Sequence, residues 1–334
     1  MNLGSPDSTS VKDVRRYLNE FLMDERVIDV PWLQRTVLVK GIITPFRASK
    51  SAHAYKTIWT EDGSPLIVIS KQLQQAVQQK VDDPVEIAMR YGNPSPAVAF
   101  EALLKKVRDL EEVVLVPLYP HYALASYETA VEYAKAIYKK NRYTFKLTVV
   151  PPYFNDPGYI HALSESMRPY LRDEYDHILF SYHGIPARHL HNRDVSQVQK
   201  CIEAGSCAAG GIGKHKNCYR YEVFETTGLV TQALNIPKEK YSVSFQSRLG
   251  KGWLEPFTDI RLEQMPKEGI KKLLIVSPAF VSDCLETLEE LEMRGKETFL
   301  NAGGESYKMI PCMNVQPAWV DVVARLSSGV AQPV

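Results

Sequence analysis

The sequence lacks both a charge excess and a long apolar run. Its 334 residues include 40 basic and 39 acidic side chains, which leaves a formal net charge of +1. Without a basic excess there is no extended positive field to hold a polyanion, so nucleic acid is not an expected partner. No apolar run approaches about 18 residues, so no transmembrane helix is expected. The first residues, MNLGSPDSTS, resemble neither a signal peptide nor an Arg-rich transit peptide, and we expect a cytoplasmic protein.

Cysteine is scarce, and its number is odd. Three of the five cysteines, Cys201, Cys207 and Cys218, fall in one short segment. In a reducing compartment this distribution argues against a disulfide framework and for free thiols, a metal or a cluster. Intervals of five and then ten residues between these cysteines match no common zinc site. An inert loop with incidental cysteines is therefore a second interpretation of the segment.

Nucleotide-binding loops are also missing. The segment GGIGKHK at 210–216 lacks the Walker spacing and has no strand before it, and no G-x-G-x-x-G sequence opens a helix. The absence of both fingerprints disfavours a dehydrogenase.

What is present is an alternation of short runs rich in Val, Ile and Leu with longer amphipathic segments. Such an alternation predicts parallel sheets with right-handed crossovers. The predicted strands are 65–70, 85–91, 112–119, 145–150, 177–182, 241–246, 271–278 and 307–311. The predicted helices are 11–22, 96–110, 127–140 and 159–175.

The pattern predicts an α/β protein with two similar Rossmann-like domains, each a doubly wound parallel sheet, and an active-site cleft between them. The predicted domains are residues 1–143, residues 144–312 with the cysteine-containing loop 201–218, and a C-terminal helix and tail, 313–334, that packs back on the body. A single closed barrel is the weaker alternative.

The carboxyl ends of the strands are where ligands bind in open parallel sheets. The predicted strand 177–182 leads directly into His183, and Gly184 and Pro186 are expected to turn the chain sharply away from it. Because imidazole titrates near neutral pH, His183 suits a general base or a metal ligand. A satisfied structural histidine is the alternative.

A second candidate is a run of carboxylates near residue 283. A helix is predicted to begin near Asp283, and Asp283 with Glu286 fits a reciprocal N-terminal cap. The cap does not explain Glu290, which lies four residues after Glu286, a spacing at which like charges repel by roughly 0.2–0.5 kcal/mol. Stacked carboxylates above a cleft would guide a cation or carry protons.

A third candidate is the loop that follows the predicted strand 241–246. It carries several aromatic residues and one cation, Phe245, Arg248, Trp253 and Phe257. Such a set forms either the loop's own small core or the wall of a site for a planar ligand.

These segments together resemble the ferrochelatase family, and they follow the family's order over nearly the whole chain. The matching segments are NLGSPD (2–7), TEDGSPL (60–66), MRYGNPS (89–95), PLYPHY (117–122), FSYHGIP (180–186), FQSRLGKGWLEPFTD (245–259) and VSDCLETLEEL (281–291). The last three are similar to the Gram-negative protoporphyrin branch of the family.

The resemblance implies a lyase that inserts Fe²⁺ into protoporphyrin IX, forms protohaem and releases two protons, the terminal step of haem biosynthesis, with no organic cofactor. The family's histidine and glutamate pair falls on His183 and Glu286, which would both contact the Fe²⁺ substrate. Its acidic proton or metal path continues onto Asp283 and Glu290. The porphyrin-binding positions implied by the resemblance are Leu3, Ser64, Arg90, Tyr91, Tyr119 and Trp253.

Two features depart from the family pattern. Members usually begin with a short apolar strand just before NLGSPD, so we expect either a start upstream of Met1 or a first sheet without its opening strand. Some bacterial members hold a 2Fe–2S cluster on four cysteines of an internal segment. Here Cys201, Cys207 and Cys218 supply three ligands, which leaves the cluster open.

The expected partners are protoporphyrin IX and Fe²⁺. A peripheral membrane contact for porphyrin delivery, and the choice between monomer and homodimer, are left open. Alternative functions are a chelatase for another metal or tetrapyrrole, such as coproporphyrin or sirohydrochlorin, and a non-catalytic haem- or cluster-binding sensor. A zinc hydrolase using His183, His189 and His191 is a further alternative, although we expect His189 and His191 to be solvated and His177 to mark the entry of its strand.

Overall fold

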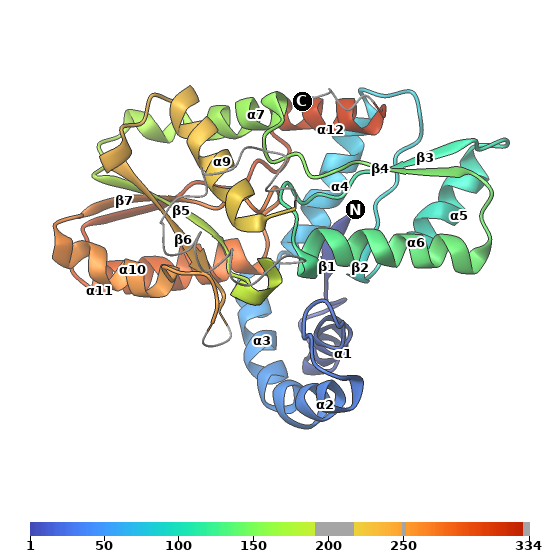
Figure 1. Ribbon diagram of the computed structural model, residues 1–334, viewed down its shortest axis with the longest axis horizontal. Coiled ribbons are helices and arrows are strands. Elements are labelled where there is room, and N and C mark those ends of the chain that lie inside the picture. The colour runs from blue at the N-terminus through green and yellow to red at the C-terminus, as the bar shows by residue number, and fades with distance from the viewer. Residues whose placement is uncertain (191–216, 249–251, 330–334) are drawn as a thin grey trace.

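Parallel β-sheets flanked by helices form the body of the molecule, as Figure 1 shows for the computed structural model. Residues 1–190, 217–248 and 252–329 are described. The strands are β1 (Asn2–Ser5), β2 (Met89–Gly92), β3 (Glu112–Leu115), β4 (Lys146–Val149), β5 (His177–His183), β6 (Tyr241–Gln246), β7 (Lys272–Val276) and β8 (Ser306–Met309). They pair in parallel as β1-β2, β3-β4 and β6-β5-β7-β8. The predicted α/β class is confirmed.

The N-terminal sheet is continuous through the first residue. The Leu118 N–H donates to the Met1 carbonyl at 2.8 Å, and the amino group of Met1 donates to the Val116 carbonyl at 2.7 Å. The chain at β1 therefore lies between β2 and the continuation of β3. The first strand of the sheet is therefore Asn2–Ser5, which lies within the NLGSPD segment itself.

The sheets divide later in the chain than the predicted domain boundary. Residues Glu112 to Leu115 of β3 pair with Lys146 to Val149 of β4. Residues 146–149 therefore belong with the N-terminal strands, and the boundary predicted after residue 143 falls before a strand of the first half.

The helices cover the faces of these sheets and connect the parallel strands. The α-helices are α1 (Val11–Leu22), α2 (Trp32–Thr36), α3 (Thr44–Ile58), α4 (Pro65–Gln78), α5 (Pro96–Lys106), α6 (Thr129–Asn141), α7 (Pro157–Met167), α9 (Tyr219–Ala233), α10 (Thr258–Gln264), α11 (Lys296–Asn301) and α12 (Pro317–Ser327). The π-helices are η1 (Val37–Ile43), η2 (Leu124–Glu128) and η8 (Glu286–Gly295), and the 3₁₀ turns are η3 (Tyr170–Arg172), η4 (Ala187–Leu190), η6 (Lys238–Lys240) and η7 (Met265–Glu268). The helix predicted over 159–175 ends at Met167, because Pro169 lacks the N–H that would continue it.

The strand predicted at 65–70 is wrong, because these residues begin α4. Ser64 is the extended N-cap and Pro65 occupies the first helical position, where its missing N–H costs nothing. The buried residues Leu66, Ser70, Leu73 and Val77 recur every three or four positions. This helical period extends well beyond the six residues that looked like a strand.

A helical arm made of α1, α2, η1 and α3 projects from the body at the bottom of Figure 1. Only α1 was predicted, and residues 32–58 were not assigned to any element. The inner face of α3 carries Ala48, Ala52 and Tyr55, which pack on Val14 and Leu18 of α1. In the described ranges, no helix is long and apolar enough to cross a membrane.

The largest core lies around the four-stranded sheet. In β5, the side chains of Ile178, Leu179, Phe180 and Tyr182 have no exposed surface, as expected for a parallel strand with helices on both faces. Trp319 of α12 is fully buried in the same core, where α12 packs against α7 and α4.

Candidate active site

The predicted histidine stands at the carboxyl end of a central strand. His183 ends β5 and is in register with Gln246, which ends β6. The Gly184 N–H donates to the Gln246 carbonyl at 2.8 Å. A Cβ on Gly184 would lie 2.7 Å from that carbonyl oxygen and 3.4 Å from the Trp253 ring. Glycine is therefore required for the close approach of the ends of β5 and β6. The sequence alone had suggested only that Gly184 helps to turn the chain.

The loop after β6 returns to this end of β5. The Ala187 N–H donates to the Gly252 carbonyl at 2.8 Å, and the Leu254 N–H donates to the Ile185 carbonyl at 3.0 Å. These bonds place half-exposed Trp253 against Gly184, one residue from His183. Two other aromatic side chains of this segment, Phe245 of β6 and Phe257, are buried. The Arg248 guanidinium lies 4.3 Å from the Phe257 ring centroid.

The His183 ring is oriented by the backbone carbonyl of the next residue, Gly184. Its Nδ1 lies 2.7 Å from the Gly184 carbonyl oxygen, which can only accept a hydrogen bond. In the neutral ring Nδ1 therefore carries the proton, and Nε2 keeps the lone pair that can accept one. The Tyr219 hydroxyl donates to the His183 carbonyl at 2.8 Å, and the Phe280 ring centroid lies 6.2 Å from that of the imidazole. His183 is half-exposed, so Nε2 can meet a ligand.

The Glu290 carboxylate is held by a single serine of the opposite loop. Glu290 Oε1 accepts the Ser247 N–H at 2.9 Å, and Oε2 accepts the Ser247 hydroxyl at 2.6 Å. Burial raises the pKa of Glu290, the Ser247 hydrogen bond opposes this change, and the negative charge of Glu286 raises the pKa further. The charge of His183 lowers the pKa of Glu290. The side-chain amide of Gln246, the register partner of His183, donates to the Glu286 carbonyl at 3.4 Å.

Glu286 lies where η8 meets the helical arm. Leu285, the residue before it, packs in the arm's cluster with Tyr17 and Tyr55. Burial raises the pKa of Tyr55, and the charge of Glu286 raises it further. Because η8 is wound with i→i+5 hydrogen bonds, Glu286 and Glu290 stay on one side of it. Such π-helical turns occur frequently at functional sites.

The predicted reciprocal cap between Asp283 and Glu286 is not formed. The Asp283 side chain instead bonds to Thr287 of η8 and to residues 312–314. Its carboxylate accepts the Asn314 amide at 2.7 Å and the Thr287 hydroxyl at 3.0 Å, and its own N–H donates to the Asn314 side chain at 2.8 Å. The Cys312 N–H adds a third, longer bond of 3.3 Å. The predicted helix begins at Glu286, and buried Asp283 ties its start to residues 312–314. Asn314 had no signal in the sequence.

The Arg90–Tyr91 pair meets an acid that the sequence analysis missed. Arg90 forms an ion pair with the Asp24 carboxylate and donates from Nε to the Thr129 hydroxyl at 2.6 Å. The Tyr91 hydroxyl donates to Asp24 at 3.0 Å, and Tyr91 has no exposed surface. Tyr91 therefore lies within the apolar cluster between the body and the helical arm. The Arg90 guanidinium lies over the Tyr91 and Tyr133 rings, at 4.2 and 4.4 Å from their centroids.

The remaining predicted porphyrin contacts lie in the N-terminal half and are largely covered. Ser64 is buried at the start of α4, where its carbonyl accepts the first helical N–H groups. Tyr119 is buried next to Leu3, and its hydroxyl has no hydrogen-bond partner among the described residues. An unpartnered buried hydroxyl carries a desolvation cost of about 1–3 kcal/mol.

His189 was predicted to be solvated, and this prediction is wrong. Its side chain is 4 % exposed, and Nε2 lies 3.0 Å from the Asp29 carboxylate, which Arg188 grips with two further bonds of 2.5 and 2.7 Å. No group of three or more His, Cys, Asp or Glu side chains able to hold a metal occurs in the described ranges. His191 lies outside them. Of the other two histidines in the zinc-hydrolase alternative, His189 is paired with Asp29 and His183 ends β5.

The cluster prediction falls mostly outside the described residues. Cys201 and Cys207 are not among them, and Cys218 is half-buried at the N-cap of α9. A separate cavity of about 930 Å³ lies between α4, α5, α12 and the strands of the N-terminal half, and none of the predicted catalytic residues lines it.

Comparison with known proteins defines first the fold and then the family. The solved structure of SirB from Bacillus subtilis with Fe³⁺ matches with a TM-score of 0.53 and 13% identity, over 78% of this chain and 90% of that one. At that identity the likeness shows the chelatase fold alone. The curated ferrochelatases of Opitutus terrae and Pseudomonas putida are 48% and 47% identical over 97% of this chain, and the alignments cover 94% and 96% of their own lengths. The ferrochelatase family profile matches residues 1–329. The chain belongs to the ferrochelatase family.

Proposed function

We propose that this ferrochelatase inserts Fe²⁺ into protoporphyrin IX to give protohaem, with His183 and Glu286 acting on the reacting centre. Two porphyrin N–H bonds break, the metal gains its bonds to the porphyrin nitrogens, and two protons leave with no change of oxidation state. The observation that carries the proposal is the geometry at the strand ends: His183 is in register with Gln246, the Gln246 amide donates to the Glu286 carbonyl at 3.4 Å, and the next residue, Ser247, holds the Glu290 carboxylate. This site contains both a proton acceptor and carboxylates that can contact a divalent cation such as Fe²⁺.

His183 is the proposed first acceptor of a pyrrole proton. The Gly184 carbonyl fixes the proton of the neutral ring on Nδ1, so Nε2 is the nitrogen that can accept. The imidazolium formed there would be stabilised by the carboxylates of Glu286 and Glu290. Those same carboxylates would otherwise repel each other, and the arriving positive charge relieves that repulsion.

Glu286 is the proposed contact for Fe²⁺, and Glu290 continues the path for protons. Because burial and the charge of Glu286 raise the pKa of Glu290, its carboxyl group takes a proton more readily than an exposed glutamate. Asp283, with three hydrogen bonds to its carboxylate, is placed to hold η8 in position and is the member of the path with the least freedom.

The porphyrin contacts implied by the family are proposed to form when the macrocycle binds. Trp253 is half-exposed and lies against Gly184, the residue after His183. The further proposed contacts come from the N-terminal half: Leu3, Ser64, Arg90, Tyr91 and Tyr119. Apolar and aromatic contacts with a flat macrocycle supply binding energy that can offset its distortion toward the metallated form. The division into two Rossmann-like domains is part of this proposal.

Further elements of the proposal concern the cell. We place the protein in the cytoplasm, with porphyrin delivered through a peripheral membrane contact. A 2Fe–2S cluster would draw on Cys201, Cys207 and Cys218, and the visible spectrum of anaerobically purified protein tests it. No step of the reaction is assigned to such a cluster.

The test is anaerobic mixing of the protein with Fe²⁺ and protoporphyrin IX, followed by the loss of porphyrin fluorescence over many turnovers. His183→Ala is expected to lower kcat by about 100-fold or more, the usual contribution of a positioned base. Glu286→Gln keeps the shape of the side chain and is expected to lower both turnover and the affinity for Fe²⁺.

His161→Ala is the matched control, because His161 is exposed on α7 and lies outside the proposed site. Absence of turnover in the wild type, or an unchanged kcat for His183→Ala, would refute the assignment. Parallel assays with coproporphyrin III and with sirohydrochlorin decide the tetrapyrrole, and faster turnover of either would replace protoporphyrin in the proposal.

A further inference from the structure

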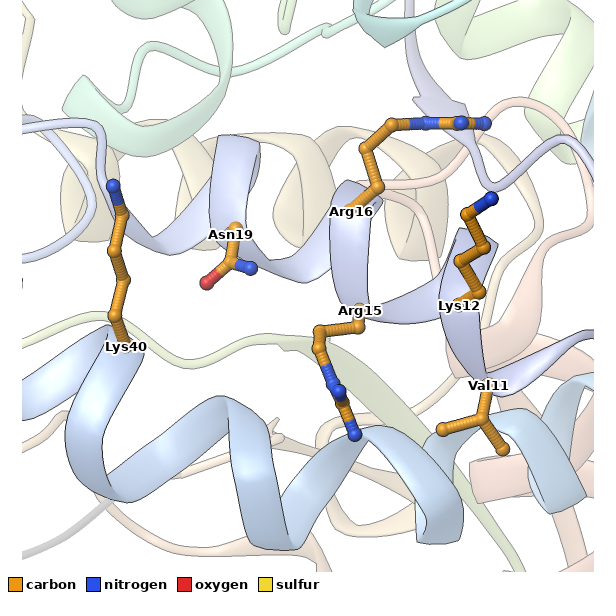
Figure 2. Close-up of a pocket in the computed structure, with 6 residues that line it drawn as sticks. All are labelled: Val11, Lys12, Arg15, Arg16, Asn19 and Lys40. Atoms are coloured by element: carbon orange, nitrogen blue, oxygen red, sulfur yellow. The ribbon is translucent and has the colours of Figure 1, made fainter.

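Buried aromatic side chains of β5, α9 and the segment after β3 meet beside the proposed base, His183. Tyr182, Tyr219 and His121 are all buried there. A basic depression of about 610 Å³ lies elsewhere, between α1 and η1 in the helical arm (Figure 2), and neither it nor the cavity of the N-terminal half is lined by His183 or by a residue of α9. The orientation of His183 therefore has to be explained by the buried side chains around it.

One hydrogen bond joins this aromatic group to the backbone of the base. The Tyr219 hydroxyl donates to the His183 carbonyl at 2.8 Å. Burial raises the pKa of the Tyr219 hydroxyl, and Tyr182 and Glu222 raise it further, so the hydroxyl stays protonated and serves as a donor. Any effect of this hydroxyl on the reaction therefore passes through the carbonyl that it binds.

The His183 carbonyl lies beyond the pairing of β5 with β7. The two strands pair only as far as Phe180 and Val276. Two residues after Val276 comes Pro278, which has no N–H to continue the ladder. A buried carbonyl needs a donor from another source, and here the Tyr219 hydroxyl of α9 provides it.

The peptide group between His183 and Gly184 is thereby held at both of its polar atoms. Its carbonyl oxygen accepts the Tyr219 hydroxyl, and its N–H donates to the Gln246 carbonyl at 2.8 Å. Because a peptide group is planar, two hydrogen bonds at its opposite edges fix its orientation. The clamp matters at this point, because glycine has no Cβ to restrict the rotation of the chain.

The clamped peptide group controls the imidazole through the next carbonyl. His183 Nδ1 lies 2.7 Å from the Gly184 carbonyl oxygen, which keeps the proton of the neutral ring on Nδ1. If the peptide group rotates, the Gly184 carbonyl moves with it and the bond to Nδ1 is lost. The proton can then occupy Nε2, which removes the lone pair that the proposed mechanism uses.

The Tyr219 ring is itself fixed by buried neighbours. It meets the His121 ring edge-on, with 6.1 Å between the centroids and 81° between the planes. His121 Nε2 lies 2.9 Å from the Thr226 hydroxyl of the same helix, and the next residue, Thr227, bonds to the Tyr182 hydroxyl at 2.8 Å. α9 is therefore attached to both of the last two residues of β5.

We propose that Tyr219 is a positioning residue for metal insertion. Its hydroxyl fixes the peptide group after His183, and this group directs the lone pair of His183 Nε2 toward the porphyrin. The inference rests on the proposed function, because it assumes that His183 accepts a pyrrole proton. A core tyrosine without this role would contribute to stability alone.

The test is Tyr219→Phe, which removes the hydroxyl and keeps the ring against His121. In the anaerobic assay with Fe²⁺ and protoporphyrin IX, kcat should fall about 10-fold, a part of the roughly 100-fold contribution of a positioned base. KM for the porphyrin should stay as in the wild type. Nitrogen NMR of the neutral His183 ring, assigned by its absence in His183→Ala, should show the Nδ1–H tautomer in the wild type and a mixture of both tautomers in Tyr219→Phe.

A double variant separates action through His183 from any other effect. Combined with His183→Ala, the change Tyr219→Phe should lower kcat no further, because the base that it positions is gone. An equal fold loss of kcat in both backgrounds would overturn the proposal. A wild-type kcat in Tyr219→Phe, or a ring that keeps only the Nδ1–H tautomer, would overturn it as well.

Tyr138→Phe is the matched control, because the Tyr138 hydroxyl of α6 also donates to a main-chain carbonyl, that of Phe145, at 2.6 Å. Both variants should unfold cooperatively in urea, and Tyr138→Phe should keep the wild-type kcat. An equal fall of kcat in the two variants would overturn the proposal, since the loss of any tyrosine hydroxyl would then have the same effect. A 100-fold loss in His183→Ala beside unchanged turnover in Tyr219→Phe refutes this inference alone, whereas unchanged turnover in His183→Ala refutes the proposed function.

Discussion

Ser247 holds a left-handed backbone conformation, with φ +62°, at the point where β6 leaves the sheet. A residue with a Cβ is uncommon in this region, and such strain persists only where its surroundings impose it. Here both the N–H and the hydroxyl of Ser247 are bonded to the Glu290 carboxylate. These two bonds therefore both orient the Glu290 carboxylate and hold the Ser247 backbone in its left-handed conformation.

Removing the Ser247 hydroxyl should move the pH dependence of metal insertion. The hydroxyl lowers the pKa of Glu290, so Ser247→Ala and Ser247→Gly should both raise that pKa and shift the Glu290-dependent limb of the kcat profile to higher pH. Glycine tolerates the positive φ, so Ser247→Gly should be more stable than Ser247→Ala by about 1 kcal/mol. The measurements are kcat against pH and urea unfolding. An identical profile in all three proteins would show that Glu290 does not titrate in the reaction.

Glu222 of α9 is a buried acid outside the proposed site. It is 2% exposed, burial raises its pKa to about 8, and its carboxylate accepts the Tyr122 N–H at 2.6 Å. A folded-state pKa above the unfolded value of about 4.5 gives stability that is complete below pH 4.5 and is lost as pH rises through 8. The loss is on the order of 4–5 kcal/mol.

Glu222→Gln removes this loss, because the amide stays neutral. The difference in unfolding free energy between variant and wild type should therefore grow in the variant's favour from pH 5 to pH 8.5, measured in urea. Burial lowers the pKa of neighbouring His121 to about 3, but this contribution is common to both proteins and cancels in the difference. Glu225→Gln on the same helix controls for the loss of one charge. A difference independent of pH would mean that Glu222 stays ionised in the fold.

At the scale of elements, β5 and β6 can pair up to His183 only because Gly184 has no side chain. Gly184→Ala would place a Cβ 2.7 Å from the Gln246 carbonyl oxygen, so the strand ends must separate. Overpacking of this kind costs about 1–3 kcal/mol. We expect kcat to fall as well, because His183 directly precedes Gly184 and its ring is hydrogen-bonded to the Gly184 carbonyl.

Gly228→Ala is the control for this variant. Gly228 lies within α9 with no atom within 4 Å of the added Cβ, so alanine should stabilise the helix by about 0.5–1 kcal/mol. Thermal unfolding and kcat of both variants are the measurements. A Gly184→Ala protein as stable and active as the wild type would show that the strand ends yield without cost.

The elements also show what the sequence can and cannot predict. β6 and α1 have the bounds predicted for them, because alternation and a capped amphipathic period are local signals. Residues 65–69 at the start of α4 are all apolar. A short apolar run of this kind fits a buried strand and a helix equally well, and only the helical period of the residues that follow distinguishes them. The arm helices were missed because apolar residues on two faces leave no single stripe to recognise.

The same limit applies to the candidate site. His183 could be found from its position after a strand, which is local information. Glu286 and Glu290 lie 103 and 107 residues after His183 in the chain. The contacts of Asp24 with Tyr91 and of Asn314 with Asp283 span 67 and 31 residues. Only the folded topology brings such residues together, and no spacing rule in the sequence contains them.

At the scale of the whole molecule, Asp29 joins the base of the helical arm to the loop that follows His183. Its carboxylate receives two bonds from Arg188 and one from His189, and these partners lower the pKa of Asp29. Because the folded-state pKa is depressed, the link stabilises the protein above the ordinary pKa of 3.8 and loses that contribution as pH falls through the folded value. Arg188 is 59% exposed at its side chain, so solvent screens the pair and its contribution stays within about 1 kcal/mol.

Asp29→Asn should therefore cost little stability but should loosen the site. With the link weakened, the loop that positions Trp253 beside His183 loses its tie to the N-terminal half, and KM for the porphyrin should rise several-fold more than kcat falls. Glu268→Gln is the matched control, because Glu268 forms a similar two-bond pair with Arg261 inside the C-terminal half. It should cost the same stability and leave KM unchanged. Equal KM values for the two variants would show that the link between the halves plays no part in porphyrin binding, and that the arm and the loop act independently.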